Sequence, residues 1–396
     1  MVIIMLQKLY NFFKDKKILL LGYGLEGQSA FKLLDRLDCA QSVTVWEEYH
    51  HTTALPAEYD IIIKSPGIPL FKRTDEFDPR ITGQADLFLR FCENVVVGVT
   101  GTKGKSTTSA LIHHILSERG VSAKLIGNIG VPPFDVVEEL GDEVVVMELS
   151  CHQLEYVKAS PKIAVLLNIH EEHLDHYVDF AHYKRAKENI FRFQGDGDVL
   201  IRGEDVDSSL IAATVADKAK LRGKHNLHNI AVAAKAVKYA ARDIDENAAI
   251  QSGCNFAGLL HRLELFAEIN GVKWVNDSIG TIPAATIAAV EAFPETDTLI
   301  IGGMDRGIDY SLLVEFLHNR PDINVIALPE SGHKIAASLP NVYTARDLAD
   351  AVAHAAIITK KCCVLSPAAA SYGFYKNFEE RGEHFKELTR QLTVDN

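Results

Sequence analysis

The sequence predicts an α/β protein built of three domains with parallel, doubly wound sheets. Strand-like runs rich in β-branched residues alternate with helical patterns along the chain. Two of those runs enter glycine-rich turns that open helices, at residues 22–27 and 101–104. At 396 residues, the chain is also too long for one ordinary hydrophobic core. We therefore expect the doubly wound arrangement to recur in successive domains.

Composition and charge exclude several classes of protein. A hydrophobic fraction of 47% and a charged fraction of 24% are those of a soluble globular protein. The net charge of −12 argues against nucleic-acid binding, because phosphate contacts need clustered Lys and Arg. The apolar run within residues 1–17 is too short to span a bilayer and lacks the features of a signal peptide. The six scattered cysteines indicate neither a disulfide framework nor a Cys-x-x-Cys metal site, so we expect a cytoplasmic protein.

The first segment, residues 16–48, is predicted to form a strand, a glycine-rich turn, an amphipathic helix and a second strand. Gly22, Gly24 and Gly27 spell the G-x-G-x-x-G pattern, and Glu47 follows about twenty residues later, as in the dinucleotide-binding fingerprint. Taken alone, this segment favours an NAD-dependent oxidoreductase.

The second glycine-rich turn lies between a strand at residues 94–100 and a helix. The strict phosphate-loop pattern has glycine where this chain has Val99, so context carries the prediction. A strand, a glycine-rich turn and a helix together aim backbone N–H groups and the helix N-terminus at an anion. Lys105 would then reach the outer phosphates of a nucleotide, and Ser106 or Thr107 would face Mg²⁺.

Glu148 lies at the C-terminal tip of a predicted strand within residues 143–150. In the simplest winding this strand runs parallel to the phosphate-loop strand. A carboxylate at that edge could hold Mg²⁺ directly or through water, because hard cations prefer oxygen ligands. An exposed strand-end Glu is the alternative, but the neighbouring phosphate loop favours the metal role.

His170, His173 and His176 follow the next predicted strand at three-residue spacing. The zinc motifs H-E-x-x-H and H-x-x-E-H are both absent, so solvated loop histidines are the alternative to metal ligation. The helix that follows carries Lys184 and Lys187, and surface exposure is the default expectation for both lysines.

Domain boundaries are expected near Glu93 and, after an Ala-rich helix, near Gly258. Strands and helices alternate again in the last part, as in a third doubly wound unit. The predicted domains are residues 1–93, 94–258 and 259–396.

Ten short segments, in order along the chain, resemble one enzyme family. They are Ser65–Ile68 (SPGI), Thr100–Thr107 (TGTKGKST), Gly127–Gly130 (GNIG), Glu148–Glu155 (ELSCHQLE), Leu167–Tyr177 (LNIHEEHLDHY), Tyr183–Lys187 (YKRAK), His225–Ala234 (HNLHNIAVAA), His261–Glu264 (HRLE), Asn276–Thr281 (NDSIGT) and Leu365–Gly382 (LSPAAASYGFYKNFEERG). In this set the chain resembles the Mur ligase family over essentially its whole length. The SPGI and ELSCHQLE segments are similar to those of its D-glutamate-adding branch.

The resemblance implies an amide ligation in which ATP phosphorylates the alanine carboxylate of UDP-N-acetylmuramoyl-L-alanine. The amine of D-glutamate would then displace phosphate from that acyl phosphate. The resemblance also implies a Rossmann-like first domain for the UDP-substrate, a central P-loop ATPase-type domain, and a Rossmann-like last domain for the amino acid and nucleotide. It further implies two Mg²⁺ sites, with Mn²⁺ as an alternative metal, in a cytoplasmic monomer of peptidoglycan precursor synthesis.

The same resemblance implies roles for individual residues. The nucleotide would contact Gly101, Thr102, Lys103, Gly104, Lys105, Ser106, Thr107, Asn229, Arg262 and Asp277. The UDP-substrate would contact Gly22, Gly24, Leu25, Glu26, Glu47, Gly67, Asn128 and Gln153, with Trp46, Glu47 and Glu48 as alternatives at the uracil. The metal ligands would be Ser106, Glu148, His173 and Lys187, the lysine as a carbamate that offers oxygen to Mg²⁺. The catalytic candidates are Lys105, Glu148, His173 and Lys187. The amino acid would contact Thr281, Arg306, Ser371, Tyr372 and Phe378.

Three positions of the amino-acid pocket depart from the family's pattern. Ile279 and Arg306 stand where the family has lysines, and Tyr372 replaces a usual Leu. The added amino acid therefore stays open between D-glutamate and another one. An NAD-dependent oxidoreductase, a non-catalytic P-loop module and a folylpolyglutamate synthase are the competing hypotheses. The first leaves Lys105 and Glu148 unexplained, and the last lacks a UDP-binding domain of this kind.

Overall fold

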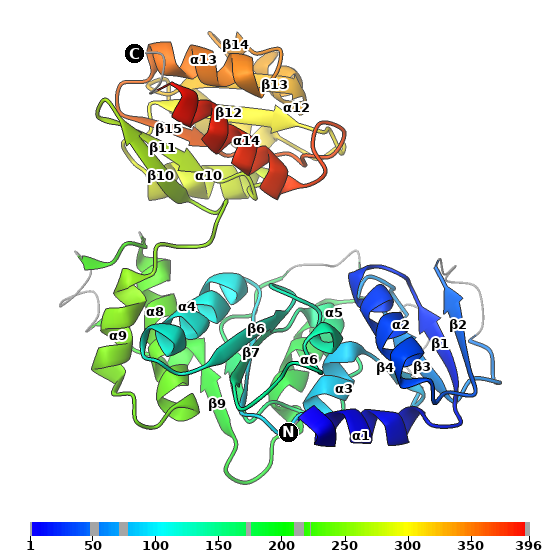
Figure 1. Cartoon of the computed structure of the whole chain (residues 1–396). Helices are drawn as coiled ribbons and strands as arrows, with labels where there is room; N and C mark the ends of the chain where they lie inside the picture. Colours follow the sequence, from blue (N-terminus) through cyan, green and yellow to red (C-terminus); the bar gives the residue numbers. More distant parts are fainter. Residues whose placement is uncertain are drawn as a thin grey trace. The chain divides into compact units, whose positions relative to one another are not determined.

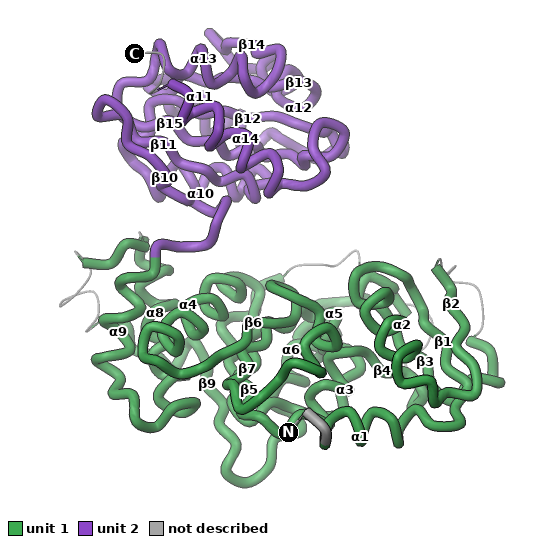
Figure 2. The backbone as a smooth tube through the Cα atoms, in the orientation of Figure 1, with its two compact units in different colours: residues 1–256 green, residues 257–396 purple. Residues whose placement is uncertain are grey.

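The computed structural model describes residues 2–47, 55–70, 78–171, 176–209, 218–221 and 223–392. The chain forms two compact units, residues 1–256 and 257–396 (Figure 2). Unit 1 contains two parallel sheets and unit 2 contains one sheet, and each unit has its own hydrophobic clusters.

The first sheet of unit 1 has four parallel strands in the order β2-β1-β3-β4 (Figure 1). Its segment consists of α1 (Val2–Phe13), β1 (Lys17–Leu21), α2 (Leu25–Leu37), β2 (Ser42–Trp46), β3 (Ile61–Lys64), β4 (Ile81–Thr82) and α3 (Gln84–Phe91). The two middle strands are buried on both faces, which is why β1 and β3 are nearly continuous Leu and Ile. Helix α1 buries Met5, Leu9 and Phe13, an apolar stripe at four-residue spacing.

The second sheet of unit 1 has five parallel strands in the order β6-β7-β5-β8-β9. Its segment consists of β5 (Val96–Thr100), α4 (Lys105–Glu118), β6 (Ala123–Gly127), η1 (Pro133–Asp135), β7 (Val144–Glu148), α5 (Cys151–Leu154), β8 (Ile163–Leu166), α6 (Phe180–Arg192), β9 (Val199–Arg202), η2 (Gly203–Asp205), α8 (Lys224–Ala240) and α9 (Glu246–Asn255). The chain leaves β5 toward β6 and β7 on one side, and places β8 and β9 on the other. The loops after β5 and β8 therefore diverge at the carboxyl edge, where open α/β sheets bind ligands.

Unit 2 has a six-stranded sheet in the order β10-β11-β15-β12-β13-β14. Its segment consists of β10 (Glu264–Ile269), β11 (Val272–Asn276), α10 (Pro283–Ala292), β12 (Thr298–Gly303), α11 (Ser311–His318), β13 (Asn324–Glu330), α12 (Ser331–Ala336), β14 (Tyr343–Thr344), α13 (Leu348–Ile358), β15 (Cys362–Leu365) and α14 (Phe378–Gln391). β10 and β11 form an antiparallel hairpin, and the other pairs are parallel.

The predicted α/β class with parallel sheets is confirmed by this topology. The strand, turn and helix around both glycine-rich loops form as predicted. Helix α1 and the antiparallel hairpin were not predicted. The boundary near Glu93 stays a prediction, because both sheets before residue 256 belong to one compact unit. Among the described residues, no helix has the length and apolar character needed to cross a membrane.

Candidate functional site

The backbone of the loop after β5 favours glycine at two positions. Gly101 and Gly104 have φ values of 155° and 87°, which disfavour residues with a Cβ atom. A Cβ on Gly101 would lie 2.9 Å from the Cβ of Leu167, and one on Gly104 would lie 3.0 Å from Oδ1 of Asn229. Helix α4 begins directly after Gly104, so its free N–H groups point at the space above the loop.

Asn168, two residues after the end of β8, braces this loop. Its carbonyl oxygen accepts from the N–H of Thr102 at 2.8 Å. Its side chain accepts from the N–H of Lys103 at 2.9 Å and donates to the Lys103 carbonyl at 3.0 Å. The Thr102 hydroxyl lies 2.9 Å from the Tyr183 hydroxyl of α6. Sequence reasoning did not single out Asn168, although a polar residue just after a buried strand was an available signal.

Two lysines converge on one oxygen of the loop. Lys105 Nζ donates to the Gly101 carbonyl at 3.0 Å, and Lys187 Nζ donates to the same oxygen at 2.7 Å. Lys187 comes from α6 and is 1% exposed, so the default expectation of a surface lysine is wrong for it. The side chain of Lys184 is 54% exposed and fits that default. Two positively charged groups at one carbonyl oxygen make this a favourable place for a bound anion.

Glu148 lies at the end of β7, and its Cα pairs with that of Val99 in β5, directly before the loop. Its side chain is fully buried. Oε1 accepts from the Asn128 side chain at 2.8 Å, whereas Oε2 has no hydrogen-bond partner among the residues that the structure describes. A buried carboxylate oxygen without a partner is costly, and a hard cation is a ligand that would satisfy it. The prediction that Glu148 binds metal therefore fits the site.

The structure describes only some of the other predicted metal ligands. Ser106 lies in the first turn of α4, partly buried. His173 lies outside the described residues. Among the described residues, no group of three or more His, Cys, Asp or Glu side chains could hold a metal ion. A magnesium site at Glu148 and Ser106 would therefore need further oxygen ligands, which nucleotide phosphates and a carbamate at Lys187 would supply.

Three of the predicted nucleotide contacts lie outside the loop. Asn229 of α8 lies beside the loop, against Gly104. Arg262 and Asp277 belong to unit 2. Asp277 Oδ2 accepts from the Ser366 hydroxyl at 2.7 Å, and Oδ1 accepts from the Leu263 N–H at 3.1 Å. Burial raises the pKa of Asp277 to about 7 despite these hydrogen bonds.

The first glycine-rich loop joins β1 to α2. Gly22 has a φ of 90°, and its carbonyl oxygen accepts from the Ser65 hydroxyl at 2.9 Å, which joins the two predicted substrate segments. Gly24 caps α2, and Leu25 after it is 81% exposed. Gly67, Trp46 and Glu47 lie at the same carboxyl edge of the sheet, whereas Glu48 lies outside the described residues.

A hydrogen bond joins two residues that were both predicted to contact the UDP-substrate, Glu26 of α2 and Gln153 of α5. It links the segments of the two sheets of unit 1. Gln153 Nε2 donates to Glu26 Oε1 at 2.6 Å. Gln153 also closes a capping box with Ser150 at the start of α5, which fixes its orientation. Burial raises the pKa of Glu26, and the Gln153 bond opposes that rise.

A buried ion cluster that the sequence did not indicate lies beside this pair. Lys64 Nζ is 3.0 Å from Glu155 Oε2, and His176 Nε2 is 2.7 Å from Glu155 Oε1. Burial alone would raise the pKa of Glu155, but Lys64 and His176 outweigh it and the pKa is lowered. Of the predicted histidines, His176 therefore serves this cluster and His170 is exposed.

The predicted amino-acid contacts gather in unit 2 on loops that follow β11, β12 and β15. Arg306 Nη2 donates to the Thr281 carbonyl at 3.1 Å. The backbone of Met304 pairs with Ala370, the residue before Ser371. Ser371 is buried and Tyr372 is 59% exposed, and Phe378 begins α14.

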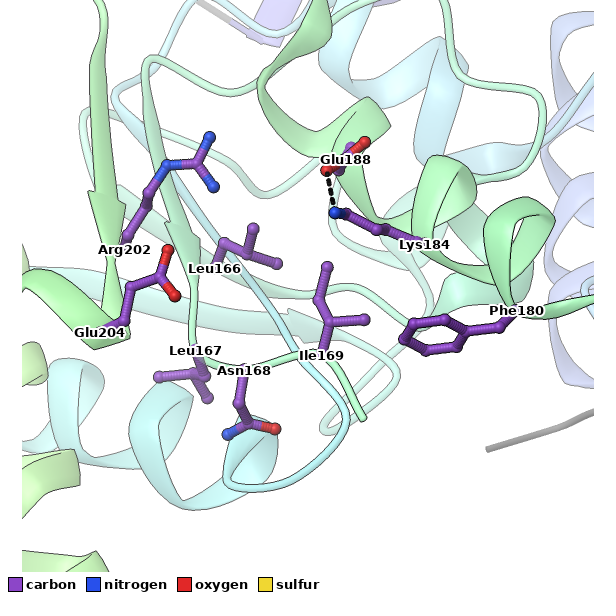
Figure 3. Close-up of a pocket in the computed structure, with 9 residues that line it drawn as sticks. All are labelled: Leu166, Leu167, Asn168, Ile169, Phe180, Lys184, Glu188, Arg202 and Glu204. Atoms are coloured by element: carbon purple, nitrogen blue, oxygen red, sulfur yellow. Dashed lines mark ion pairs between the residues drawn. The ribbon is translucent and has the colours of Figure 1, made fainter. Parts of the chain in front are cut away.

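A pocket of about 240 Å³ lies beside the phosphate loop, at the carboxyl edge of β8 and β9 (Figure 3). In Figure 3, Lys184 and Glu188 extend from α6, and Arg202 and Glu204 lie on the opposite side, at the end of β9. The pocket is also lined by Asn168, which braces the phosphate loop. The pocket carries both signs of charge.

Comparisons with known proteins agree on one family. Residues 99–219 match the family model described as the Mur ligase middle domain. A UDP-N-acetylmuramoylalanine–D-glutamate ligase of Clostridium kluyveri is 32% identical over an alignment that covers 85% of this chain and 84% of that protein. A ligase of the same name from Clostridium botulinum is 30% identical over an alignment that covers 97% of this chain and 99% of that protein.

The chain belongs to the Mur ligase family. The fold of this Mur ligase is similar to that of MurF ligase from Thermotoga maritima, with a TM-score of 0.58 and 18% identity, covering 98% of this chain and 97% of that one. FolC of E. coli has a TM-score of 0.54 and 18% identity but covers only 75% of this chain and 89% of that one. The whole-chain fold is therefore shared with Mur ligases.

Proposed function

We propose that this Mur ligase joins D-glutamate to UDP-N-acetylmuramoyl-L-alanine at the expense of ATP, in the synthesis of peptidoglycan precursors. The observation that carries the proposal is the convergence of Lys105 and Lys187 on Gly101, next to an unpartnered oxygen of Glu148. Cations and a metal-binding carboxylate around a phosphate loop are what phosphoryl transfer needs. The names of the clostridial relatives supply the two substrates.

The residues of the loop would position the phosphoryl group. Backbone N–H groups at the start of α4 would bind the phosphates of ATP. Lys105 would neutralise charge on the γ-phosphoryl group as the alanine carboxylate bonds to its phosphorus and ADP leaves. The amine of the amino acid would then attack the acyl carbon, which releases phosphate and a proton and forms the amide.

Mg²⁺ would supply charge neutralisation among the phosphate oxygens. Glu148 and Ser106 fit such an ion, and His173 is proposed for a second one. Lys187 fits only after its neutral amine has bonded to CO₂ with loss of a proton, because an ammonium cannot ligate a cation. Its buried position at the phosphate loop, with Nζ at the Gly101 carbonyl, supports that role.

Loops of unit 2 would bind the incoming amino acid through Thr281, Arg306 and Ser371. Ile279 cannot pair with a carboxylate, so Arg306 would take over charge recognition through its planar fork. We further propose that the protein acts as a monomer in the cytoplasm. Its six free cysteines suit a reducing compartment.

The test is phosphate release from ATP with UDP-N-acetylmuramoyl-L-alanine, measured against a panel of amino acids. We expect release that requires both the UDP-substrate and D-glutamate, with a product heavier by one glutamate residue. Release with a neutral or basic amino acid in place of D-glutamate would reject the proposed acceptor. The rival oxidoreductase predicts a change in NADH fluorescence on mixing with the protein, and we expect none.

A further inference from the structure

Arg381, near the start of α14, is buried although it carries a charge. Among the described residues it is the largest fully buried side chain, at 1% exposure. Burial lowers its pKa to about 10, so the guanidinium is still charged at neutral pH. A charge buried to this degree needs a structural or functional reason.

The guanidinium ties two loops together through neutral oxygens. Nε donates to the Ser278 hydroxyl at 3.0 Å, and Nη2 donates to the Ser278 carbonyl at 2.8 Å. On the other loop, Nη2 donates to the Ala369 carbonyl at 3.0 Å and Nη1 to the Ala370 carbonyl at 3.3 Å. One planar group therefore sets the distance and angle between the two loops.

These two loops carry the proposed acceptor contacts. Ser278 precedes Thr281 by three positions, and Ala370 directly precedes Ser371. The Ser278 hydroxyl also donates to the Phe378 carbonyl at 2.8 Å, which links the same network to a third proposed contact. A shift of Arg381 would therefore move the segments that carry Thr281, Ser371 and Phe378.

Arg381 makes no direct ion pair. In the described part of the chain, no carboxylate lies at ion-pair distance from Arg381, and the Asp277 carboxyl acts on it only at longer range. Lys386, farther along α14, is the contrast, because it is also buried but lies 3.1 Å from Glu264 and 2.8 Å from Glu383. A buried cation without a direct ion pair is stabilised by an anion that binds near it.

A pocket of about 270 Å³ lies against Arg381. Its lining includes Ser371, Gly303 and Arg381, and the charged pair Arg346 and Asp347. A Cβ on Gly303 would lie 3.0 Å from Nη1 of Arg381, so glycine lets the backbone approach that edge of the guanidinium. The pocket thus borders both the buried charge and a proposed acceptor contact.

We propose that Arg381 is a positioning residue that makes the acceptor pocket select an acidic amino acid. It aligns the loops of Thr281 and Ser371 and supplies a positive charge, without a direct ion pair, next to them. This inference rests on the proposed function and extends it to a residue outside the predicted contacts.

The test compares D-glutamate with its neutral isostere D-glutamine in the phosphate-release assay. Arg381→Gln should raise the KM for D-glutamate about tenfold or more, and should lower the preference for D-glutamate over D-glutamine by a similar factor. KM values for ATP and the UDP-substrate should change by less than about threefold. Arg381→Lys keeps the charge but not the fork, so it should restore part of the preference.

Lys386→Met is the matched control, because it removes a buried cation from the same helix whose charge is already paired. It should lower stability without changing the preference for D-glutamate. If Arg381 variants do not fold, Ser278→Ala removes one of the bonds with a smaller change and should also raise the KM for D-glutamate.

Folded Arg381→Gln enzyme with the wild-type preference would overturn the inference, as would an equal loss of preference in Lys386→Met. An unchanged KM in Ser278→Ala would do the same where the Arg381 variants fail to fold. Failure of the proposed function looks different, because the wild-type enzyme itself would then show no preference for D-glutamate.

Discussion

Replacing Asp277 by Asn should stabilise unit 2, and by more at pH 8 than at pH 5. Burial raises the pKa of Asp277 from 3.8 to about 7, so the folded state holds a proton that the unfolded state has released. Between those two values the folded state binds more protons, and stability falls as the pH rises. Asn removes this titration and can keep the contacts to Ser366 and Leu263.

The size of the effect follows from the shift in pKa. A rise of about 3 pKa units corresponds to about 4 kcal/mol of destabilisation above pH 7, as an upper limit. Between pH 5 and pH 8, the advantage of Asn over Asp in the free energy of unfolding should grow by roughly 2 to 3 kcal/mol.

Urea unfolding followed by the fluorescence of Trp274 would measure this change in the free energy of unfolding. Trp274 is buried in β11, and the only other tryptophan, Trp46, can be replaced by Phe in every variant so that the signal comes from unit 2. Asp322→Asn is the control, because pairing with Arg320 lowers the pKa of Asp322 and Asn should bring no gain there. An advantage of Asp277→Asn that is the same at both pH values would refute the reasoning.

Three further predictions concern the reaction. Lys105→Ala should lose phosphate release by about a thousandfold with an unchanged circular dichroism spectrum, and near-normal turnover would remove the phosphate-loop assignment. Lys187→Ala should be inactive and partly rescued by acetate, which supplies an oxygen ligand; an intact-mass measurement showing unmodified Lys187 in active enzyme would contradict the carbamate. Arg306→Ala should raise the KM for D-glutamate about tenfold or more and leave that for ATP nearly unchanged, and unchanged D-glutamate kinetics would assign its recognition to another cation.

The phosphate loop was predictable because its signal is local. A β-branched strand, glycines and a helix within residues 94–118 are enough to indicate an anion site. The antiparallel hairpin had a local signal too, the turn pair Asn270 and Gly271, which both have positive φ.

The convergence of side chains was not predictable from pattern alone. Lys187 is separated by 86 residues from the carbonyl that it shares with Lys105, and only the packing of α6 against the loop brings them together. Arg381 follows Glu379 and Glu380, a charged run typical of an exposed helix, yet tertiary contacts bury it. Resemblance to a family supplied the role of Lys187, and the fold supplied its geometry.

The central claim is that the site activates a carboxylate by forming an acyl phosphate. UDP-N-acetylmuramoyl-L-alanine with both oxygens of the alanine carboxylate labelled by ¹⁸O tests it most directly. One labelled oxygen should bond to the γ-phosphorus of ATP and leave with it when the amine attacks, so mass spectrometry should find one ¹⁸O in each phosphate released with D-glutamate. Unlabelled phosphate, or label found in AMP, would contradict the account.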